Sequence, residues 1–201
     1  MRIAYPFLLL LLCCGQLAAQ HETLFGNISS SGAFGGPILE ISSINGQLGG
    51  DVGGGGAVVL DNFFIGGYGM GTSYPELVLT QEIDGELQDV FYDIRFKHGG
   101  LWFGYTPQQH KVLHPYTSLK IGWGQARLRH DEFRMPSDRI FVLTPEAGIE
   151  ANLTSFFKLG ITVGYRWVNG INRLPALGNQ DFSSLTSALT FRFGSFGDGW
   201  R

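Results

Sequence analysis

Apolar and polar residues alternate with a period of two along much of the second half of the chain. Between residues 157 and 167 every second residue is apolar, from Phe157 to Trp167, and the residues between them are small or charged. A period of two puts the two sets on opposite faces of an extended strand. The sequence therefore predicts strands at 157–167 and 185–193, and the same pattern predicts strands at 118–124 and 141–152.

The first half of the chain alternates less clearly, because glycine dilutes the pattern. Its strands, predicted at 35–43, 48–60 and 63–72, rest mainly on the turns between them. Asn45-Gly46 and Asp61-Asn62 are two-residue hairpin signals.

A further strand is predicted at 90–105, where the apolar set changes phase. Tyr92, Ile94 and Phe96 alternate with charged residues, whereas Leu101 and Tyr105 belong to the other set. A β-bulge at residues 99–100 would shift the phase in this way.

Counting gives eight strands joined alternately by short and long connections. Residues 61–62, 106–112 and 153–156 form short connections, and residues 73–89, 130–139 and 169–183 form longer, more polar ones; the first connection, 44–47, is brief. An even strand number with this asymmetry is typical of outer-membrane barrels. The prediction is an all-β, eight-stranded antiparallel up-and-down transmembrane β-barrel.

The N-terminus predicts export. Arg2, an apolar run at 7–14 and the pair Ala18-Ala19 follow the order of a secretory signal peptide. We expect a signal peptide at 1–20, a short periplasmic leader at 21–31 and the barrel at 32–201. Both cysteines, Cys13 and Cys14, lie in the signal peptide, so the mature chain has no thiol.

Composition supports a barrel wall. Charged residues make up 15% of the chain, against about 25% in a typical soluble domain, and 30 of 201 residues are glycine, about twice the usual share. Without Arg2 the chain has 13 basic and 17 acidic side chains, a balance that does not favour nucleic acid as a partner.

The polar face is expected to line a filled lumen. In a soluble barrel such as a lipocalin the apolar face points inward, but here the polar face combines small residues with charges of both signs. Buried charges need partners, so we expect Glu146 and Glu150 to pair with bases such as Arg166 and Lys158. The predicted inward charges are Glu40, Asp51, Asp93, Arg95, Lys97, Lys120, Glu146, Glu150, Lys158, Arg166 and Arg192.

Aromatic residues on the apolar face lie near the predicted strand ends. Such girdles mark the two interfaces of a membrane barrel, although aromatics in the core of a soluble β-sandwich would give a similar pattern. The set toward the short turns is Phe63, Tyr105, Phe157 and Phe193, and the set toward the long loops is Tyr92, Trp123, Tyr165 and Trp167.

Four short motifs carry a family resemblance: FGGP at 34–37, EANLT at 150–154, GYR at 164–166 and LTFRFG at 189–194. With the strand pattern, they make the chain similar to the glycine-rich family of small outer-membrane β-barrels of Gram-negative bacteria. The resemblance implies an outer-membrane location, contact with outer-membrane lipid and insertion by the barrel-assembly machinery. That machinery reads a C-terminal signal similar to 189–194, although residues 195–201 follow it here.

No constellation of residues indicates catalysis, a cofactor or a metal. The lipid-deacylating barrels carry serine two residues after histidine, and none of the five histidines has one there. His110 and His114 have a zinc-like spacing but no clear third ligand, and Glu146 and Glu150, roughly 13 Å apart along a strand, are too far apart for paired acid–base work.

The sequence thus favours a non-enzymatic barrel with a structural role or with loops that mediate adhesion or binding to an unidentified ligand. A narrow channel for small solutes or ions is the first alternative, because the predicted lumen is charged. A lipid-modifying enzyme and a secreted lipocalin-like binder are further alternatives.

Overall fold

The computed structural model describes residues 30–72, 77–83, 85–130, 133–174 and 176–197. The predicted signal peptide and nearly all of the predicted leader lie outside these residues. The described residues form one short helix, α2 (Asn179–Phe182), and the strands β1 (Ser31–Ile44), β2 (Gln47–Leu60), β3 (Phe63–Thr72), β4 (Leu77–Ile83), β5 (Glu86–Tyr105), β6 (Leu113–His130), β7 (Phe133–Asn152), β8 (Phe157–Asn169) and β9 (Ser184–Ser195).

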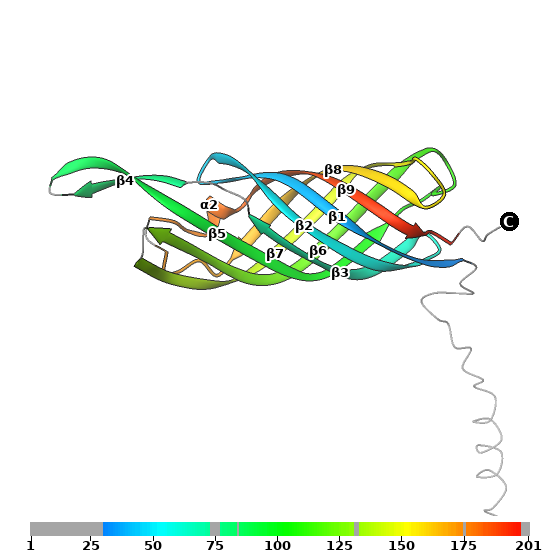
Figure 1. Ribbon diagram of the computed structural model, residues 1–201, viewed down its shortest axis with the longest axis horizontal. Coiled ribbons are helices and arrows are strands. Elements are labelled where there is room, and N and C mark those ends of the chain that lie inside the picture. Colours follow the sequence, from blue (N-terminus) through cyan, green and yellow to red (C-terminus); the bar gives the residue numbers. More distant parts are fainter. Residues whose placement is uncertain (1–29, 73–76, 84, 131–132, 175, 198–201) are drawn as a thin grey trace, which may run out of the picture.

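The strands close into a barrel (Figure 1). Their order is β3-β2-β1-β9-β8-β7-β6-β5-β4, every pairing is antiparallel, and a further pairing of β3 with β5 completes the ring. Eight strands, all except β4, make up the wall. The predicted eight-stranded antiparallel up-and-down barrel is therefore confirmed.

Two predicted hairpin turns are confirmed by their backbone. Asn45 and Gly46 both have positive φ, 50° and 74°, and Ile44 pairs with Gln47 across them. Such a turn fits the right-handed twist of its strands and suits asparagine and glycine. Asp61, with φ 52°, begins the second turn, and its Oδ1 accepts a hydrogen bond from Ser30 N at 2.9 Å.

The strands are longer than predicted at one end of the barrel, which we call the arm end. Residues 77–83, predicted as part of a loop, pair with residues 86–92, of which 86–89 were predicted as loop and 90–92 as strand. This hairpin of β4 and the start of β5, called the arm below, projects beyond the barrel in Figure 1. The loop predicted at 130–139 is mostly strand, because β6 reaches His130 and β7 starts at Phe133. The opposite end carries the short connections and is called the short-turn end.

The predicted bulge at residues 99–100 is wrong. Gly99 pairs with Gly69 on one side and Trp123 on the other, and the register of β5 runs unbroken from Lys97 to Tyr105 on both sides. Tyr92 is buried on the same face of β5 as Ile94, Phe96, His98 and Trp102, and this face points into the lumen. The apolar residues therefore move from one face of β5 to the other because the surroundings of the two faces change along one uninterrupted strand.

The lumen is filled along its length by two apolar clusters with charged side chains between them. The cluster at the arm end contains Ile44, Tyr92, Ile94, Phe96, Ala126, Leu128, Ile140, Val142, Val168, Ile171, Leu174, Leu177 and Phe182. The cluster at the short-turn end contains Phe34, Ile38, Ala57, Val59, Phe64, Tyr68, Met70, Trp102, Tyr116 and Phe196. Within the described ranges, no helix has the length and apolar character needed to cross a membrane.

Candidate functional site

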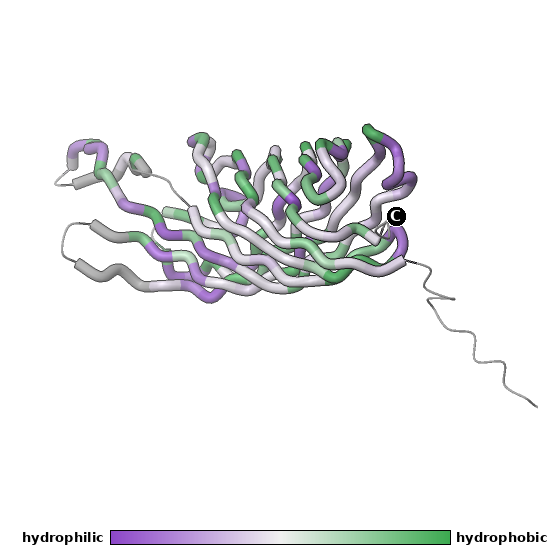
Figure 2. Tube along the Cα trace, turned by 45° about the vertical axis from the view of Figure 1, so that its right-hand side comes forward, coloured by the Kyte–Doolittle hydropathy of each residue, from purple (hydrophilic) through white to green (hydrophobic). Residues whose placement is uncertain are grey.

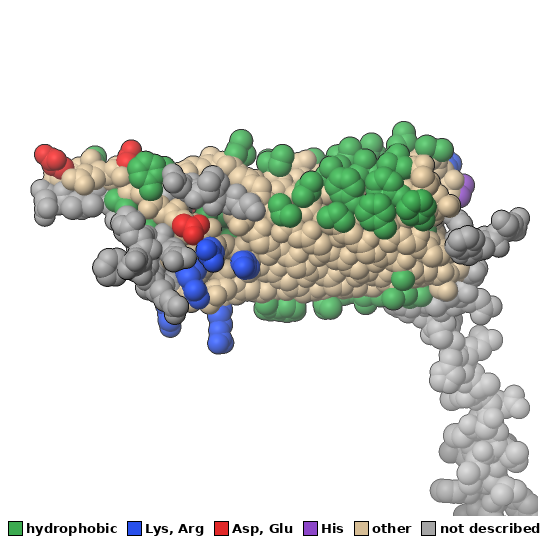
Figure 3. Space-filling view, in the orientation of Figure 1, with side chains coloured by type: hydrophobic (Ala, Val, Ile, Leu, Met, Phe, Trp, Pro, Cys, Tyr) green, Lys and Arg blue, Asp and Glu red, His purple; other side chains and the backbone are tan. Residues whose placement is uncertain are grey.

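The outer face of the wall is apolar all the way round. Every barrel strand presents at least one large apolar side chain outward, and Val163 and Trp123 are 65% and 57% exposed. Figure 3 shows part of this apolar region toward the short-turn end, and Figure 2 shows hydrophobic residues recurring along the strands of the wall. We call it the outer apolar band: Leu39, Ile41, Leu48, Val52, Val58, Phe63, Ile65, Leu101, Tyr105, Leu113, Trp123, Phe141, Ile149, Ile161, Val163, Trp167, Leu185 and Phe193.

Five charged side chains form one connected layer across the lumen. Arg166 Nη1 lies 2.6 Å from Asp51 Oδ2 and 3.6 Å from Glu40 Oε1, and Lys120 Nζ lies 3.6 Å from Glu40 Oε2 and 2.6 Å from Glu146 Oε1. All five side chains are buried, and they come from β1, β2, β6, β7 and β8. We call this set the charged layer.

Nearer the short-turn end, Arg192 is held by one carboxylate and several aromatic rings. Its Nη1 donates to Glu150 Oε2 at 2.5 Å, and Glu150 Oε1 also contacts His114 Nε2 at 3.0 Å. Aromatic faces within about 6 Å attract a guanidinium. Rings surround this one at centroid distances of 3.7 to 5.6 Å: Phe34, Phe64, Phe196 and Tyr116.

These buried charges are balanced in sign. Four carboxylates deep in the lumen face four basic side chains: Glu40, Asp51, Glu146 and Glu150 against Lys120, Lys158, Arg166 and Arg192. A fifth buried carboxylate, Asp138, lies at the arm end and accepts hydrogen bonds from backbone N–H groups. Lys158 Nζ lies 4.3 Å from the centre of the Phe196 ring. Because an uncompensated buried charge is costly, this balance lets a polar lumen stay closed to water.

The structure brings most of the predicted lumen charges together. Those found buried in the lumen are Glu40, Asp51, Lys120, Glu146, Glu150, Lys158, Arg166 and Arg192. Glu146 and Glu150 do pair with bases, but with Lys120 and Arg192 respectively. The sequence did not indicate these pairings, because they depend on which strands meet across the lumen.

Three of the predicted inward charges lie on the outside. Asp93 and Arg95 contact each other, with Arg95 Nε 3.5 Å from Asp93 Oδ2, and their side chains are 43% and 52% exposed. Lys97, also predicted inward, is exposed. The placement was wrong because β5 runs past the outer apolar band toward the arm, where the outer face is polar and the inner face is apolar.

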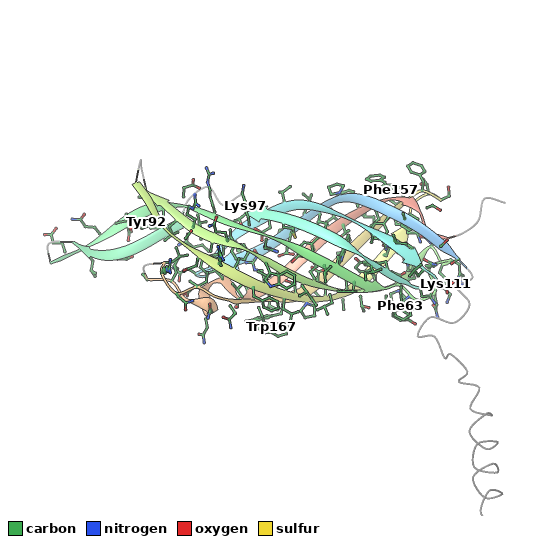
Figure 4. The ribbon with its side chains drawn as sticks, turned by 90° about the horizontal axis from the view of Figure 1, so that it is seen from below. Phe63, Tyr92, Lys97, Lys111, Phe157 and Trp167 are labelled. Atoms are coloured by element: carbon green, nitrogen blue, oxygen red, sulfur yellow. The ribbon has the colours of Figure 1, made fainter. Side chains whose placement is uncertain are left out.

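Most of the predicted interface aromatics lie on the outer face near the two ends of the band, as Figure 4 illustrates for Phe63, Phe157 and Trp167. At the short-turn end, ring centroids are 4.7 Å apart for Phe63 and Tyr105 and 4.6 Å apart for Phe157 and Phe193. Toward the arm end, the Trp123 ring contacts Phe141 and the Tyr165 ring contacts Trp167. Tyr92 is the exception: it is buried inside the lumen, so its assignment to the interface is wrong.

The arm end of the lumen is closed by residues 170–174 and 176–183, which we call the mouth segment. The Phe182 ring stacks on Phe96 at 5.4 Å, and the Phe182 carbonyl accepts a hydrogen bond from Arg166 Nε at 3.1 Å. The sequence pattern predicted a polar loop here. The apolar residues Ile171, Leu174 and Leu177, all buried, were a signal against that prediction.

Asp138 fastens the mouth segment to β7. Its Oδ2 accepts hydrogen bonds from the backbone N–H groups of Asn172, Arg173 and Leu174 at 2.8, 2.7 and 3.3 Å. Burial by itself raises the pKa of Asp138, but these N–H groups and the charge of Arg173 outweigh it and hold the pKa below its ordinary value.

Few side chains among the described residues are arranged in a way that could support metal binding or catalysis. None of their His, Cys, Asp and Glu side chains form a group of three or more that could hold a metal ion. Of the histidine pair with zinc-like spacing, His114 is buried against Glu150 and the carbonyl of Lys111, and His110 is exposed. His98 Nδ1 lies 3.1 Å from the Tyr68 hydroxyl.

Comparison with known proteins supports the fold. No protein-family profile and no curated protein sequence matches the chain. Among solved structures, Neisserial surface protein A matches with a TM-score of 0.55 and 9% identity over 83% of this chain and 96% of that chain. Ail, the attachment invasion locus protein of Yersinia pestis, solved with the heparin analogue sucrose octasulfate, matches with a TM-score of 0.47 and 15% identity over 82% of this chain and 96% of that chain.

At such low identity the comparison concerns the fold alone. The sequence-based resemblance to small eight-stranded outer-membrane barrels is confirmed at that level.

Proposed function

We propose that the protein is an integral outer-membrane β-barrel, without enzymatic activity, that holds the arm outside the cell for adhesion or binding. The outer apolar band is the observation that carries the proposal. A water-soluble monomer rarely exposes apolar patches beyond a few hundred Å², whereas a membrane barrel needs an apolar belt bounded by aromatic residues. The buried charges and exposed apolar side chains are the reverse of a lipocalin's arrangement.

The filled lumen favours a binding role over a channel. The charged layer, the ring of aromatics around Arg192 and the mouth segment occupy successive levels of the barrel interior. An eight-stranded barrel is just wide enough for such side chains. A solute would have to break buried ion pairs to pass.

The arm is the part best placed to meet a partner. Leu77 to Ile83 pair with Glu86 to Tyr92 as a two-stranded ribbon beyond the wall. Leu87 and Phe91 are 77% and 56% exposed there, with exposed Glu86 and Asp89 near them. Exposed apolar side chains on a projecting ribbon are suited to a protein contact.

The membrane part of the proposal is tested by fractionation. The full chain, produced in a Gram-negative host, should remain with outer membranes after carbonate extraction and should migrate on unheated gels as a compact folded form. Recovery in the soluble periplasmic fraction or the medium would overturn the membrane assignment.

The adhesion part is tested by shortening the arm. In this variant, residues 78–91 are replaced by Asn-Gly, a two-residue turn, and the barrel is left intact. Cells producing the native chain should attach to collagen- or laminin-coated surfaces, or to one another, more than cells without it. Cells with the shortened arm should lose this gain while keeping equal amounts of folded barrel. Equal attachment by all three strains would remove the adhesive role.

A further inference from the structure

Basic side chains gather on the outer face between the outer apolar band and the arm. Arg95 and Lys97 point outward from β5 and Arg127 from β6, although the whole chain carries a net charge of −3. Figure 3 shows Lys and Arg side chains clustered in this region of the surface. Together with Gln125 they line a hollow of about 130 Å³, called the basic hollow below.

The strand register forces the like charges together. Arg95 lies directly opposite Arg127, and Lys97 lies directly opposite Gln125. Like charges in directly opposed positions destabilise a sheet. The contact of Arg95 with Asp93 and the hydrogen bond from Arg127 Nη2 to Gln125 Oε1 at 3.3 Å are both exposed and relieve little of the repulsion.

A shallow, open and mainly apolar groove continues from the basic hollow toward the short-turn end. Its volume is about 570 Å³, it shares Lys97 and Gln125 with the hollow, and Val52 and Trp123 form part of its wall. Glycines of β3 keep it open: a Cβ added at Gly69 would meet no atom within 4 Å. We call it the glycine groove.

The level of the two features matches a lipid in the outer leaflet. Trp123 pairs with Gly99, and the pairs Lys97–Gln125 and Arg95–Arg127 follow in steps of two residues toward the arm, each step about 7 Å. Interfacial tryptophan lies near the headgroups. The basic hollow would then lie at headgroup level, with the groove reaching down toward the acyl chains.

We propose that the basic hollow and the glycine groove together bind one phosphorylated lipid of the outer leaflet. A headgroup phosphate accepts hydrogen bonds from Arg95, Lys97 and Arg127, and guanidinium groups match phosphate geometry in a bidentate manner. One acyl chain lies in the groove against Val52 and Trp123. This inference rests on the proposed membrane location and adds a specific lipid site to it.

Native mass spectrometry of the folded, full mature chain in non-ionic detergent tests the site. Bis-phosphorylated lipid A is the probe, and lipid A with both phosphates removed is its matched comparison. We expect one bound lipid A and binding weaker by about tenfold or more for the dephosphorylated form, because charge-assisted hydrogen bonds are lost. Equal binding of the two lipids would overturn the proposal.

Variants locate the site. Arg95→Gln with Arg127→Gln should weaken lipid A binding by about tenfold or more. Lys111→Gln with Arg173→Gln removes the same charge from exposed positions elsewhere and should leave binding unchanged. Gly69→Leu, which fills the groove, should also weaken lipid A binding. Equal affinities for the two double variants, or no effect of Gly69→Leu, would contradict the proposed site.

Inorganic phosphate distinguishes a lipid site from a general anion site. An equal concentration should not displace lipid A, since the acyl chain adds apolar contacts; full displacement would overturn the lipid assignment. If the proposed membrane location were wrong, the result would be different: the chain would fractionate as soluble and would lack the compact folded form on unheated gels.

Discussion

Arg166 Nη1 donates a hydrogen bond to Asp51 Oδ2 at 2.6 Å and thereby joins β8 to β2 across the lumen. The two strands are not neighbours in the sheet, because β1 and β9 lie between them. The same guanidinium donates to the carbonyl of Phe182 in the mouth segment. One side chain thus connects two sides of the wall and the segment that closes it.

Replacement of Arg166 by methionine should destabilise the barrel. Asp51 and Glu40 would keep their buried charges with fewer partners, and breaking a buried pair from one side costs about 3–5 kcal/mol. Urea unfolding of the protein in lipid vesicles, followed by circular dichroism, measures the change. Lys111→Gln, at an exposed position, is the control and should unfold like the native chain.

Removing both partners should cost less than removing one. The double variant Arg166→Met with Asp51→Leu replaces the ion pair by apolar groups, an exchange that is often neutral or stabilising. It should therefore recover part of the stability lost in Arg166→Met. A double variant less stable than the single one would argue that the charged layer does not act through this pair.

The mouth segment should loosen in acid. Because the pKa of Asp138 lies below its ordinary value of 3.8 in the folded protein, its stabilising effect is complete above that value and is lost as pH falls through the lower folded value. Protection of residues 171–174 from hydrogen exchange, expressed relative to the intrinsic exchange rate at each pH, should be high at neutral pH and lower at pH values below the folded pKa. Asp138→Ala should show low protection at both, having lost hydrogen bonds to a charged acceptor worth about 1.5–3 kcal/mol each.

The purified protein should show no steady conductance in planar bilayers. A variant in which residues 171–182 are removed and the ends are joined with glycines should also show no conductance. The charged layer and the aromatics around Arg192 still fill its lumen. Stable conductance steps from the native chain would support the channel alternative and contradict a sealed lumen.

A methyl group at Gly55 should be harmful, whereas one at Gly50 should not. A Cβ at Gly55 would lie 2.8 Å from the Gly67 carbonyl oxygen and 2.9 Å from the Trp102 ring. Overpacking of this kind typically costs about 1–3 kcal/mol. At Gly50 the nearest atom is 3.8 Å away, so Gly50→Ala is the matched control in the same urea unfolding experiment.

The alternation of apolar and polar residues was sufficient to predict the barrel and most of its buried charges. In β8, Lys158 and Arg166 face the lumen while Ile161 and Val163 face outward, as a period of two requires. The pattern does not, however, say which face is inside. Along β5 the same alternation has Trp102 inward and Leu101 outward in one half, and Tyr92 inward and Asp93 outward in the other.

The sequence did not predict the contacts across the lumen or those at its arm end. The partners of Glu146 and Glu150 depend on the diameter and stagger of the closed barrel, which set the strands that face each other. The arm had a usable signal in Asp84-Gly85, a hairpin dipeptide. Residues 86–89 of β5 are exposed on both faces of the arm, and so they carry no clean alternation of apolar and polar residues.

The central claim, that the outer apolar band faces lipid, is tested most directly by tryptophan quenching. Two single-tryptophan chains, one keeping Trp123 and the other Trp102, with phenylalanine at the remaining tryptophan positions, are folded into vesicles of phospholipid brominated near the headgroup. Trp123, exposed on the band, should be strongly quenched, and Trp102, buried in the lumen, only weakly. Equal quenching of the two, or none for Trp123 in a folded chain, would contradict the claim.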